Sequence, residues 1–266
     1  MNANFKIQVL GYGGAFDFQE GHSAFYVQAG NHQPFLIDSG STVLPKLKQH
    51  LTSTWRFVEE NTIIITHTHE DHVGSLSNNI YARYFGGLMV NQKAATKIIA
   101  QPNVANLIKN KLLIVNNHPQ EQFSIHDAGV YSDLGVSIAF VDTTNYHFSN
   151  FPTSGIILRD IHGAYLVISG DINIPIFGLI QEQYPEVWEE MSQFPERVCI
   201  FHDVTIYESP NNPHCFYKLL TDYKEKFPYI WPYHHDKGQM EALNQVGWVN
   251  LLGDYLDRTL EFKIPV

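Results

Sequence analysis

Apolar and polar residues follow two different periods along the chain, and each period predicts one kind of element. Alternating positions and short apolar runs rich in β-branched residues, bounded by glycine or polar turns, are typical of strands. Near the N-terminus this pattern predicts strands at residues 5–11, 23–30, 34–40 and 62–67. A second series is predicted at residues 136–143, 154–160, 164–171, 197–207 and 229–235, and one further strand at residues 110–116.

Segments with apolar residues three or four positions apart predict helices between these strands. The predicted helices lie at residues 42–51, 76–85, 92–100, 178–193 and 214–225. Strands and helices thus recur in two similar halves. We therefore expect an α+β fold in which two mixed sheets pack together with helices outside, a four-layer αββα sandwich, in a single domain over residues 1–266.

The charge balance limits the partners that the chain can have. It contains 17 Lys and Arg residues against 27 Asp and Glu residues, and its formal net charge is -10. The resulting field repels polyanions, so extended nucleic acid is not an expected partner, although a local cationic site could still attract a small anion. No apolar stretch approaches the ~20 residues of a membrane span, so no membrane association is expected.

Other features of the sequence are typical of a cytoplasmic protein. The first residues, MNANFKIQVLG, begin an alternating strand pattern and lack the layout of a secretory signal peptide. The two cysteines, Cys199 and Cys215, provide no disulfide framework. We expect both to be buried as apolar side chains, because free cysteine is usually buried.

The segment THTHEDHVGS, at residues 66–75, directly follows the apolar run TIII and is rich in metal-binding side chains. Residues two apart in an extended chain point the same way, so His67 and His69 could bind one metal ion. Asp71 and His72, where the chain turns toward a helix, could face a second ion. The alternative is an exposed polar loop with a helix N-cap at Asp71. Four potential ligands within six residues favour the metal site.

These four side chains cannot fill two metal sites, so ligands from elsewhere are needed. Three candidates stand at the ends of predicted strands: His147 in TTNYHFSN, Asp171 in VISGDI and His234 in WPYHHD. Imidazole and carboxylate ligands suit two divalent metal ions, zinc above all, and would also accept manganese or iron.

The motif THTHEDHVG resembles the HxHxDH signature of the metallo-β-lactamase superfamily, and LIDSG, NYHF, ISGD and PYHH follow the order of its other motifs. This similarity runs from residue 7 to about residue 236. Carried over by position, it implies one metal ion held by His67, His69 and His147, a second held by Asp71, His72 and His234, and Asp171 as a bridge between them.

Two further assignments follow from the same resemblance. Asp38, in LIDSG, would orient the metal loop without binding metal, although a turn-forming Asp before Gly is an alternative. In PYHH the family pattern favours His234 as the ligand. His235 would then point to the opposite face, as adjacent strand residues do.

Within the superfamily, three stretches resemble the ribonuclease Z-like phosphodiesterases. VLGYGGAF resembles their first loop, CIFHDVTI their His-acid pair at a strand end, and NPHCFYKLL a later histidine at a helix start. The resemblance implies that His202, Asp203 and His214 help an alkoxide leaving group to take a proton, with Asp71 as a further catalytic group. The alternative for each is a capping or satisfied core residue.

The substrate is inferred from charge and from resemblance. Between Asp171 and Val198 the chain carries six acidic residues and one basic residue, Arg197, so it lacks the basic arm that a tRNA-processing enzyme needs. The chain is more similar to the anti-Pycsar cyclic nucleotide phosphodiesterases. This resemblance implies a dimetal hydrolase that cleaves cyclic mononucleotides. Four aromatic residues could stack on the base or instead belong to the core: Tyr12, Phe16, Phe18 and Tyr146.

Other functions stay open at this point. One alternative is a ribonuclease Z-like RNA processing nuclease, and another is a lactone or thioester hydrolase of the same fold, which would not need the His-acid pair. A metal-binding role without turnover is a third. The expected partners are a small anionic phosphodiester substrate and a second copy of the chain in a homodimer.

Overall fold

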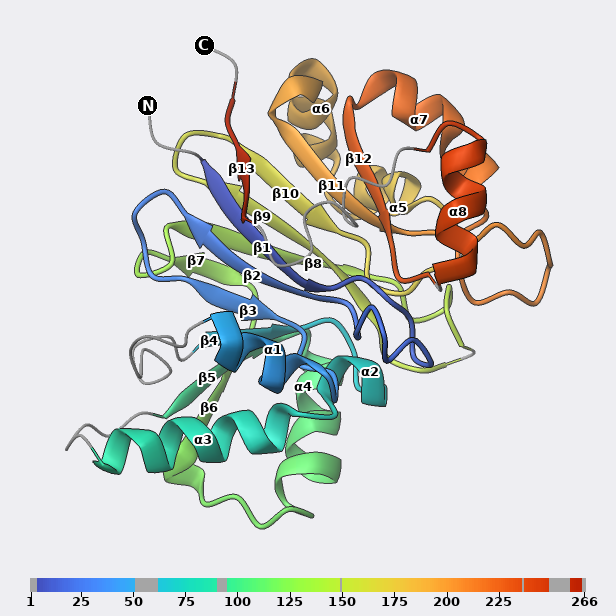
Figure 1. Cartoon of the computed structure of the whole chain (residues 1–266). Helices are drawn as coiled ribbons and strands as arrows, with labels where there is room; N and C mark the ends of the chain where they lie inside the picture. Colours follow the sequence, from blue (N-terminus) through green and yellow to red (C-terminus); the bar gives the residue numbers. More distant parts are fainter. Residues whose placement is uncertain are drawn as a thin grey trace.

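Two sheets form the centre of the molecule (Figure 1). The computed structural model describes residues 4–50, 62–89, 95–148, 150–235, 237–248 and 259–264. In this part of the chain the first sheet has the strand order β13-β1-β2-β3-β4-β5-β6, and the second has the order β12-β11-β10-β9-β8-β7.

The strands of the first sheet are β1 (Phe5–Gly11), β2 (Ala24–Ala29), β3 (Phe35–Ile37), β4 (Thr62–Ile65), β5 (Thr96–Ala100), β6 (Phe123–His126) and β13 (Thr259–Phe262). Those of the second are β7 (Gly129–Tyr131), β8 (Val136–Asp142), β9 (Ser154–Asp160), β10 (Tyr165–Ile168), β11 (Val198–Asp203) and β12 (Tyr229–Tyr233). In each sheet the pairing changes from antiparallel to parallel along the chain, at β3 in the first and at β10 in the second. The two similar halves expected from the sequence are present.

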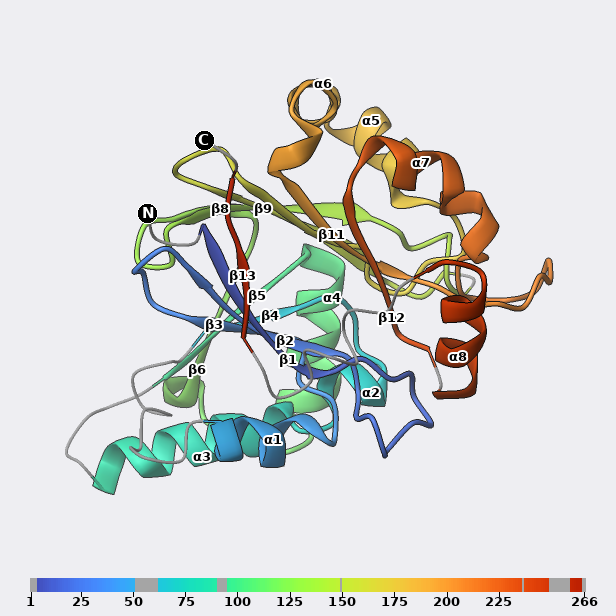
Figure 2. The same cartoon turned by 45° about the horizontal axis from the view of Figure 1, so that its top comes forward.

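Helices cover the outer face of each sheet (Figures 1 and 2). The first sheet is covered by α1 (Val43–His50), α2 (Glu70–Val73), α3 (Leu76–Met89), α4 (Pro102–Leu107) and the π-helix η2 (Ile108–Leu113). The second is covered by α5 (Ile176–Gln183), α6 (Pro185–Gln193), α7 (Thr221–Lys226) and α8 (Lys237–Gln245). Short 3-10 helices lie at Gln120–Gln122, Pro195–Arg197 and Tyr217–Leu220.

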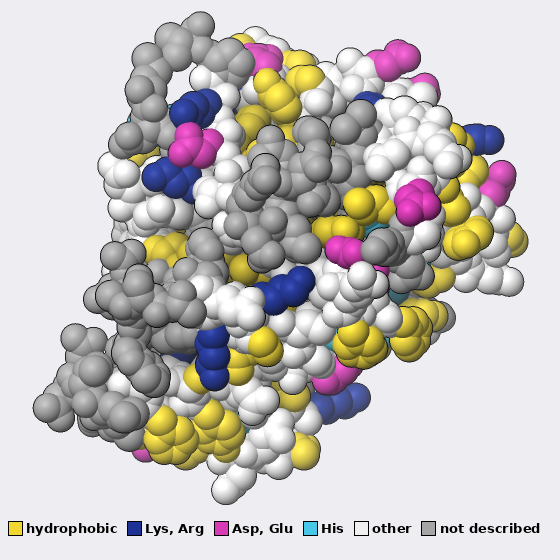
Figure 3. Space-filling model, in the orientation of Figure 1, with side chains coloured by type: hydrophobic (Ala, Val, Ile, Leu, Met, Phe, Trp, Pro, Cys, Tyr) yellow, Lys and Arg dark blue, Asp and Glu magenta, His cyan; other side chains and the backbone are white. Residues whose placement is uncertain are grey.

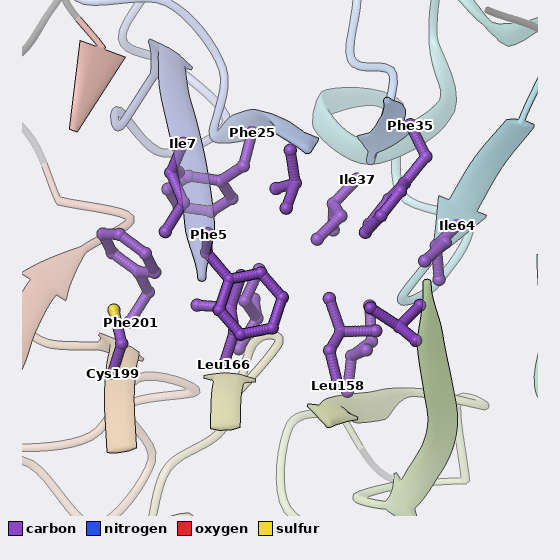
Figure 4. Close-up of a cluster of buried hydrophobic side chains, with 14 of the residues drawn as sticks. Phe5, Ile7, Phe25, Phe35, Ile37, Ile64, Leu158, Leu166, Cys199 and Phe201 are labelled. Carbon is purple, nitrogen blue, oxygen red and sulfur yellow. The ribbon is translucent and has the colours of Figure 1, made fainter. Parts of the chain in front are cut away.

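In the described part of the chain, three apolar clusters separate the four layers. The central cluster lies between the sheets, and Figure 4 shows side chains of the first sheet, such as Phe35 and Ile64, facing Leu158 and Leu166 of the second. The neighbours of Ile64 on either side, Ile63 and Ile65, instead pack against the helices. Because strand residues alternate between faces, each buried strand stabilises two layers of the sandwich at once. The predicted four-layer αββα sandwich is confirmed.

Two predicted elements are wrong. Residues 92–100 were expected to be helical, but Thr96–Ala100 forms the strand β5 between β4 and β6, and residues 92–94 lie outside the described part. Residues 110–116 were expected to form a strand, but Ile108–Leu113 is a π-helix that continues α4. A short apolar run does not distinguish a buried strand from a buried helix by period alone, and pairing with β4 and β6 decides the conformation of the Thr96–Ala100 segment.

The described helices are short. The longest, α3, has 14 residues, whereas a membrane span needs about 20 apolar ones. Among the described residues, no helix has the length and apolar character needed to cross a membrane. Both cysteines are buried, as expected, and Cys199 belongs to the cluster between the sheets.

The parallel strands of both sheets direct their carboxyl ends to one edge of the sandwich. In the first sheet β3 and β4 end at Ile37 and Ile65, immediately before Asp38 and Thr66. In the second sheet β10, β11 and β12 end beside Asp171, Asp203 and His234. Loops that are far apart in the sequence therefore meet where the two sheets come together. This is the position that ligand sites take in parallel sheets.

The central cluster should carry much of the folding free energy. Phe35 is fully buried between the sheets, so Phe35→Ala should destabilise the protein by about 3–5 kcal/mol through lost burial and a residual cavity. Urea unfolding monitored by circular dichroism measures this change. Phe16→Ala is the matched control, because Phe16 is 90% exposed and should change the stability by less than about 0.5 kcal/mol. Equal losses in the two variants would contradict this account of the core.

Candidate metal centre

The residues after β4 change from extended chain to helix within a few positions. His67 is still extended and forms an isolated β-bridge with Thr153. His69 also has an extended backbone, with φ -69° and ψ 156°, and directly precedes α2. Asp71 and His72 lie inside that helix. This change of conformation sends the side chains of the motif into two different groups.

The first group consists of side chains from three loops: His67, His69, His147 and Asp171. Nδ1 of His69 lies 3.1 Å from Nε2 of His67 and 3.2 Å from Nε2 of His147. Oδ2 of Asp171 lies 3.6 Å from each of those Nε2 atoms. Burial lowers the pKa of all three histidines.

The second group consists of Asp71, His72, Asp171 and His234. Nε2 of His72 lies 3.4 Å from Oδ2 of Asp71, from Oδ1 of Asp171 and from Nε2 of His234. Oδ2 of Asp71 lies 2.9 Å from Nε2 of His234. Burial alone would lower the pKa of His234, but Asp171 and the other nearby carboxylates raise it to about 10.

Asp171 belongs to both groups. Its Oδ2 faces the first group and its Oδ1 faces the second. The carboxylate is only 2% exposed, and within the described residues Oδ1 has no hydrogen-bond partner. Burial would raise the pKa of Asp171, but His234, His72 and His67 lower it far below its usual value. A shared carboxylate in this position could bridge two adjacent cations.

The donor set fits divalent metal ions. Ligand atoms arranged tetrahedrally at about 2.0–2.2 Å from an ion lie roughly 3.3–3.6 Å apart. The distances between donor atoms in both groups fall at or slightly below this span. Facing ring nitrogens, such as those of His67 and His69, have lone pairs that repel unless a proton or a cation lies between them. The sequence-predicted ligands are thus brought together in two groups that could each hold a metal ion.

Asp38 fixes the orientation of His72. Its carboxylate accepts hydrogen bonds from the backbone N–H of Thr66 at 2.9 Å and from the Thr66 hydroxyl at 2.8 Å. Oδ2 of Asp38 also lies 2.8 Å from Nδ1 of His72. A ring that donates through Nδ1 turns the lone pair of Nε2 toward the second group. Asp38 thus occupies the orienting position expected from the LIDSG motif.

Asp203 has a similar place on the other side of the centre. Its Oδ2 lies 2.8 Å from Nδ1 of His214 and accepts the backbone N–H of Ile172 at 3.0 Å. Its Oδ1 lies 3.8 Å from Nδ1 of His234. Burial alone would lower the pKa of His214, but Asp203 raises it above its usual value. Asp203 and His214 therefore form a hydrogen-bonded pair beside the second group.

The structure separates His202 from this pair. The His202 ring is fully buried against α5, where Nε2 accepts the backbone N–H of Ile176 at 3.1 Å and Nδ1 lies 2.7 Å from the Asp203 carbonyl oxygen. Burial lowers the pKa of His202 to about 4. Neighbouring strand residues point to opposite faces, so His202 and Asp203 cannot both face the metal groups. Of the three residues expected to act together, the structure therefore places Asp203 and His214 beside the second group, and His202 against α5.

His234 and His235 also take different directions. His234 has a left-handed backbone, with φ 63°, and its N–H donates to the Tyr12 carbonyl oxygen at 2.7 Å. This turn places the ring of His234 in the second group. The ring of His235 instead packs edge-on against the Tyr12 ring, with centroids 5.6 Å apart. His234, the residue favoured by the family pattern, therefore lies with the other candidate ligands, and the ring of His235 lies against Tyr12.

The aromatic residues singled out in the sequence fall into two classes. Tyr12 is buried between the sheets, and Tyr146 packs against the cluster under α5 to α8. Phe16 and Phe18 are exposed in the loop after β1. Sequence reasoning missed Phe151, which stacks on the His69 ring at 4.4 Å and 13°. Its position four residues after His147, on the loop that carries this histidine, was the available signal.

Known structures share this architecture. The crystal structure of the metallo-beta-lactamase fold protein YhfI from Bacillus subtilis has a TM-score of 0.67 and 15% identity, covering 91% of each chain. Unliganded yeast PDE1 has a TM-score of 0.66 and 12% identity, covering 100% of this chain and 98% of that one. The short form of human tRNase Z has a TM-score of 0.62 and 14% identity, covering 98% of this chain and 100% of that one. At such identities the likeness shows the fold.

The sequence comparisons show the family. No curated protein sequence matches the chain. The family model described as "Anti-Pycsar protein Apyc1" matches residues 5–254, nearly the whole chain. Both the resemblance carried by the motifs and the expected fold are confirmed: the chain belongs to the anti-Pycsar protein Apyc1 family and has the metallo-β-lactamase fold.

Proposed function

We propose that the protein is a metal-dependent phosphodiesterase that hydrolyses cyclic mononucleotides. The observation that carries this proposal is the position of the Asp203 and His214 pair beside His234 and the second metal group. Metal ions alone suit many hydrolytic reactions, whereas a proton donor beside them suits a reaction that expels an alkoxide. Membership of the anti-Pycsar family supports cyclic mononucleotides as the substrate class.

We assign two divalent ions to the two groups. One ion would be held by His67, His69 and His147, the other by Asp71, His72 and His234, with Asp171 shared. Zinc suits this nitrogen-rich set best, and manganese or iron would also be accepted. When bound, these ions would supply Lewis acidity toward the phosphoryl oxygens and lower the pKa of a water molecule.

The side chains around the metal groups have distinct tasks in the proposed reaction. Asp38 holds Nδ1 of His72, so that this ring need not reorient during turnover. Asp203 holds Nδ1 of His214, which leaves Nε2 of His214 to carry a proton to the departing ribose oxygen. Asp71 uses one carboxylate oxygen toward His234, and its other oxygen can accept a hydrogen bond from the attacking water.

The surface charge supports a small substrate. On the face drawn in Figure 3, Lys and Arg are interspersed with Asp and Glu among uncharged side chains, and no extended basic tract is visible among the coloured residues. A folded RNA is held through many phosphate contacts, each of which needs a cationic group. A cyclic mononucleotide has one negative charge, which the metal groups can compensate locally.

The second metal group can be tested by metal analysis of two neighbouring variants. His234→Ala should lose about one metal ion per chain, because it removes a donor that lies 2.9 Å from Asp71. His235→Ala should keep the metal, since this ring packs on Tyr12 and not in the group. Metal content after removal of free metal is measured by inductively coupled plasma mass spectrometry. The reverse pattern would show that the assignment is shifted by one residue.

The substrate class can be tested by direct comparison. The metal-loaded protein should hydrolyse cyclic AMP or cyclic GMP to a linear nucleotide, and it should trim precursor tRNA poorly at physiological salt, because it lacks a basic arm. Product formation is followed by chromatography for the nucleotides and by gel electrophoresis for the RNA. An acyl ester and a lactone serve as controls for the acyl hydrolase alternative. Efficient RNA trimming, or turnover of the acyl substrates alone, would reject the proposal.

The role of His214 can be tested with two leaving groups. His214→Ala should lower kcat on a cyclic nucleotide roughly 10²- to 10⁴-fold, the usual contribution of general acid catalysis. The loss should be much smaller on bis-p-nitrophenyl phosphate, whose leaving group needs no proton. The metal content should stay unchanged. His202→Ala, which alters a ring bonded to the α5 backbone, should show no such leaving-group dependence. Equal losses of His214→Ala on both substrates would assign His214 to binding or to structure.

A further inference from the structure

His22 lies in the loop between β1 and β2 and has a fixed backbone. The backbone N–H of His22 donates to Oγ1 of Thr42 at 2.8 Å, and His22 forms an isolated β-bridge with Gly13. The neighbouring Gly13 N–H donates to the Gly21 carbonyl oxygen at 2.8 Å. The side chain of His22 is only 2% exposed. The loop therefore holds this imidazole at a defined place inside the protein.

That place is next to the second metal group. A Cβ atom built on Gly40 would overlap the Asp71 carbonyl oxygen and would lie 2.7 Å from the Cβ of His22. Asp71 and His22 therefore line the same narrow gap at Gly40. The charges of the group also act on the ring. Burial lowers the pKa of His22, Asp71 opposes this effect, and His72 and His234 add to it.

The His22 ring is buried without hydrogen bonds. Neither Nδ1 nor Nε2 has a hydrogen-bond partner in the part of the chain that the structure describes. The Ala15 backbone lies near enough to raise the pKa of the ring. Two other buried histidines outside the metal groups, His118 and His202, use both ring nitrogens in hydrogen bonds. Burying an imidazole without hydrogen bonds costs free energy. We therefore expect its ring nitrogens to pair with a bound molecule that is not part of the chain.

We propose that His22 binds the substrate, donating a hydrogen bond from its ring to a non-bridging phosphoryl oxygen of a phosphodiester held at the second metal group. The inference rests on the proposed function and adds a contact from outside the metal-ligand motifs. A neutral imidazole always carries one N–H donor, and an anionic phosphoryl oxygen is a strong acceptor. The Phe18 ring lies 5.2 Å from the His22 ring, so an apolar side chain covers the contact on one side.

The test uses orthophosphate as the probe, because its binding does not require turnover. Isothermal titration of the metal-loaded protein should show that His22→Ala weakens phosphate binding roughly 10- to 100-fold, the span expected for one hydrogen bond to a charged group. His22→Gln, whose amide can still donate, should recover most of the affinity. His126→Ala is the matched control, since His126 is exposed on the edge strand β6 and bonds to Ser124. Metal content should be unchanged in all variants.

The outcomes separate this inference from the proposed function. Phosphate binding that depends on His22, in a protein that hydrolyses no cyclic nucleotide, would support the contact and reject the substrate class. If cyclic nucleotides are hydrolysed, His22→Ala should raise KM and His22→Gln should restore it. Unchanged phosphate affinity in both His22 variants would overturn the inference. Loss of metal in both variants would overturn it too, because His22 would then support the Asp71 loop. Failure of the wild-type protein to bind phosphate would have the same result.

Discussion

The buried carboxylate of Asp171 is the point at which the two halves of the molecule meet. It follows β10 of the second sheet, and its oxygens face His67 and His72, which follow β4 of the first sheet. A charge that is only 2% exposed costs several kcal/mol unless positive groups surround it. His67 and His72 lie about a hundred residues before Asp171 in the chain, so they can meet this carboxylate only when the two sheets are packed in their native arrangement.

Two further carboxylates repeat one task on opposite sides of the centre. Asp38 follows β3, the neighbour of β4, and orients His72. Asp203 ends β11, the neighbour of β10, and lies beside His214 and His234. In each half, one parallel strand leads to the metal groups, and the strand paired with it supplies an aspartate. That aspartate holds an imidazole in place. This arrangement reduces the reorientation that the rings would otherwise need during a reaction.

The chain combines a strongly polar centre with an acidic overall charge. The field of the whole molecule disfavours polyanions, whereas the converging donor atoms provide a place where cations could be held. The loop between β1 and β2 lies against this place through Gly40, where only a hydrogen atom fits between the Asp71 carbonyl and the His22 side chain. Glycine at position 40 thus allows the loop and the metal-binding segment to approach each other closely.

The sequence alone was sufficient for features with a strong local signal. The two periods predicted the sandwich, and the spacing of His67, His69, Asp71 and His72 predicted two directions for their side chains, because an extended segment and a short helix have different geometry. The strand-end positions of His147, Asp171 and His234 made them candidates for the same centre. The structure brings all seven side chains together.

Only the tertiary structure decided the features that depend on which face of a buried element meets which neighbour. β11 is buried on both faces, so its sequence shows no alternation that could tell whether His202 or Asp203 points to the centre. The Thr96–Ala100 segment became a strand because β4 and β6 offered it hydrogen-bonding partners on both sides. His22 gave no motif at all, and its place beside Asp71 depends on the packing of Gly40. Local patterns determine local conformation, but contacts between distant segments are fixed by the packing of the whole sandwich.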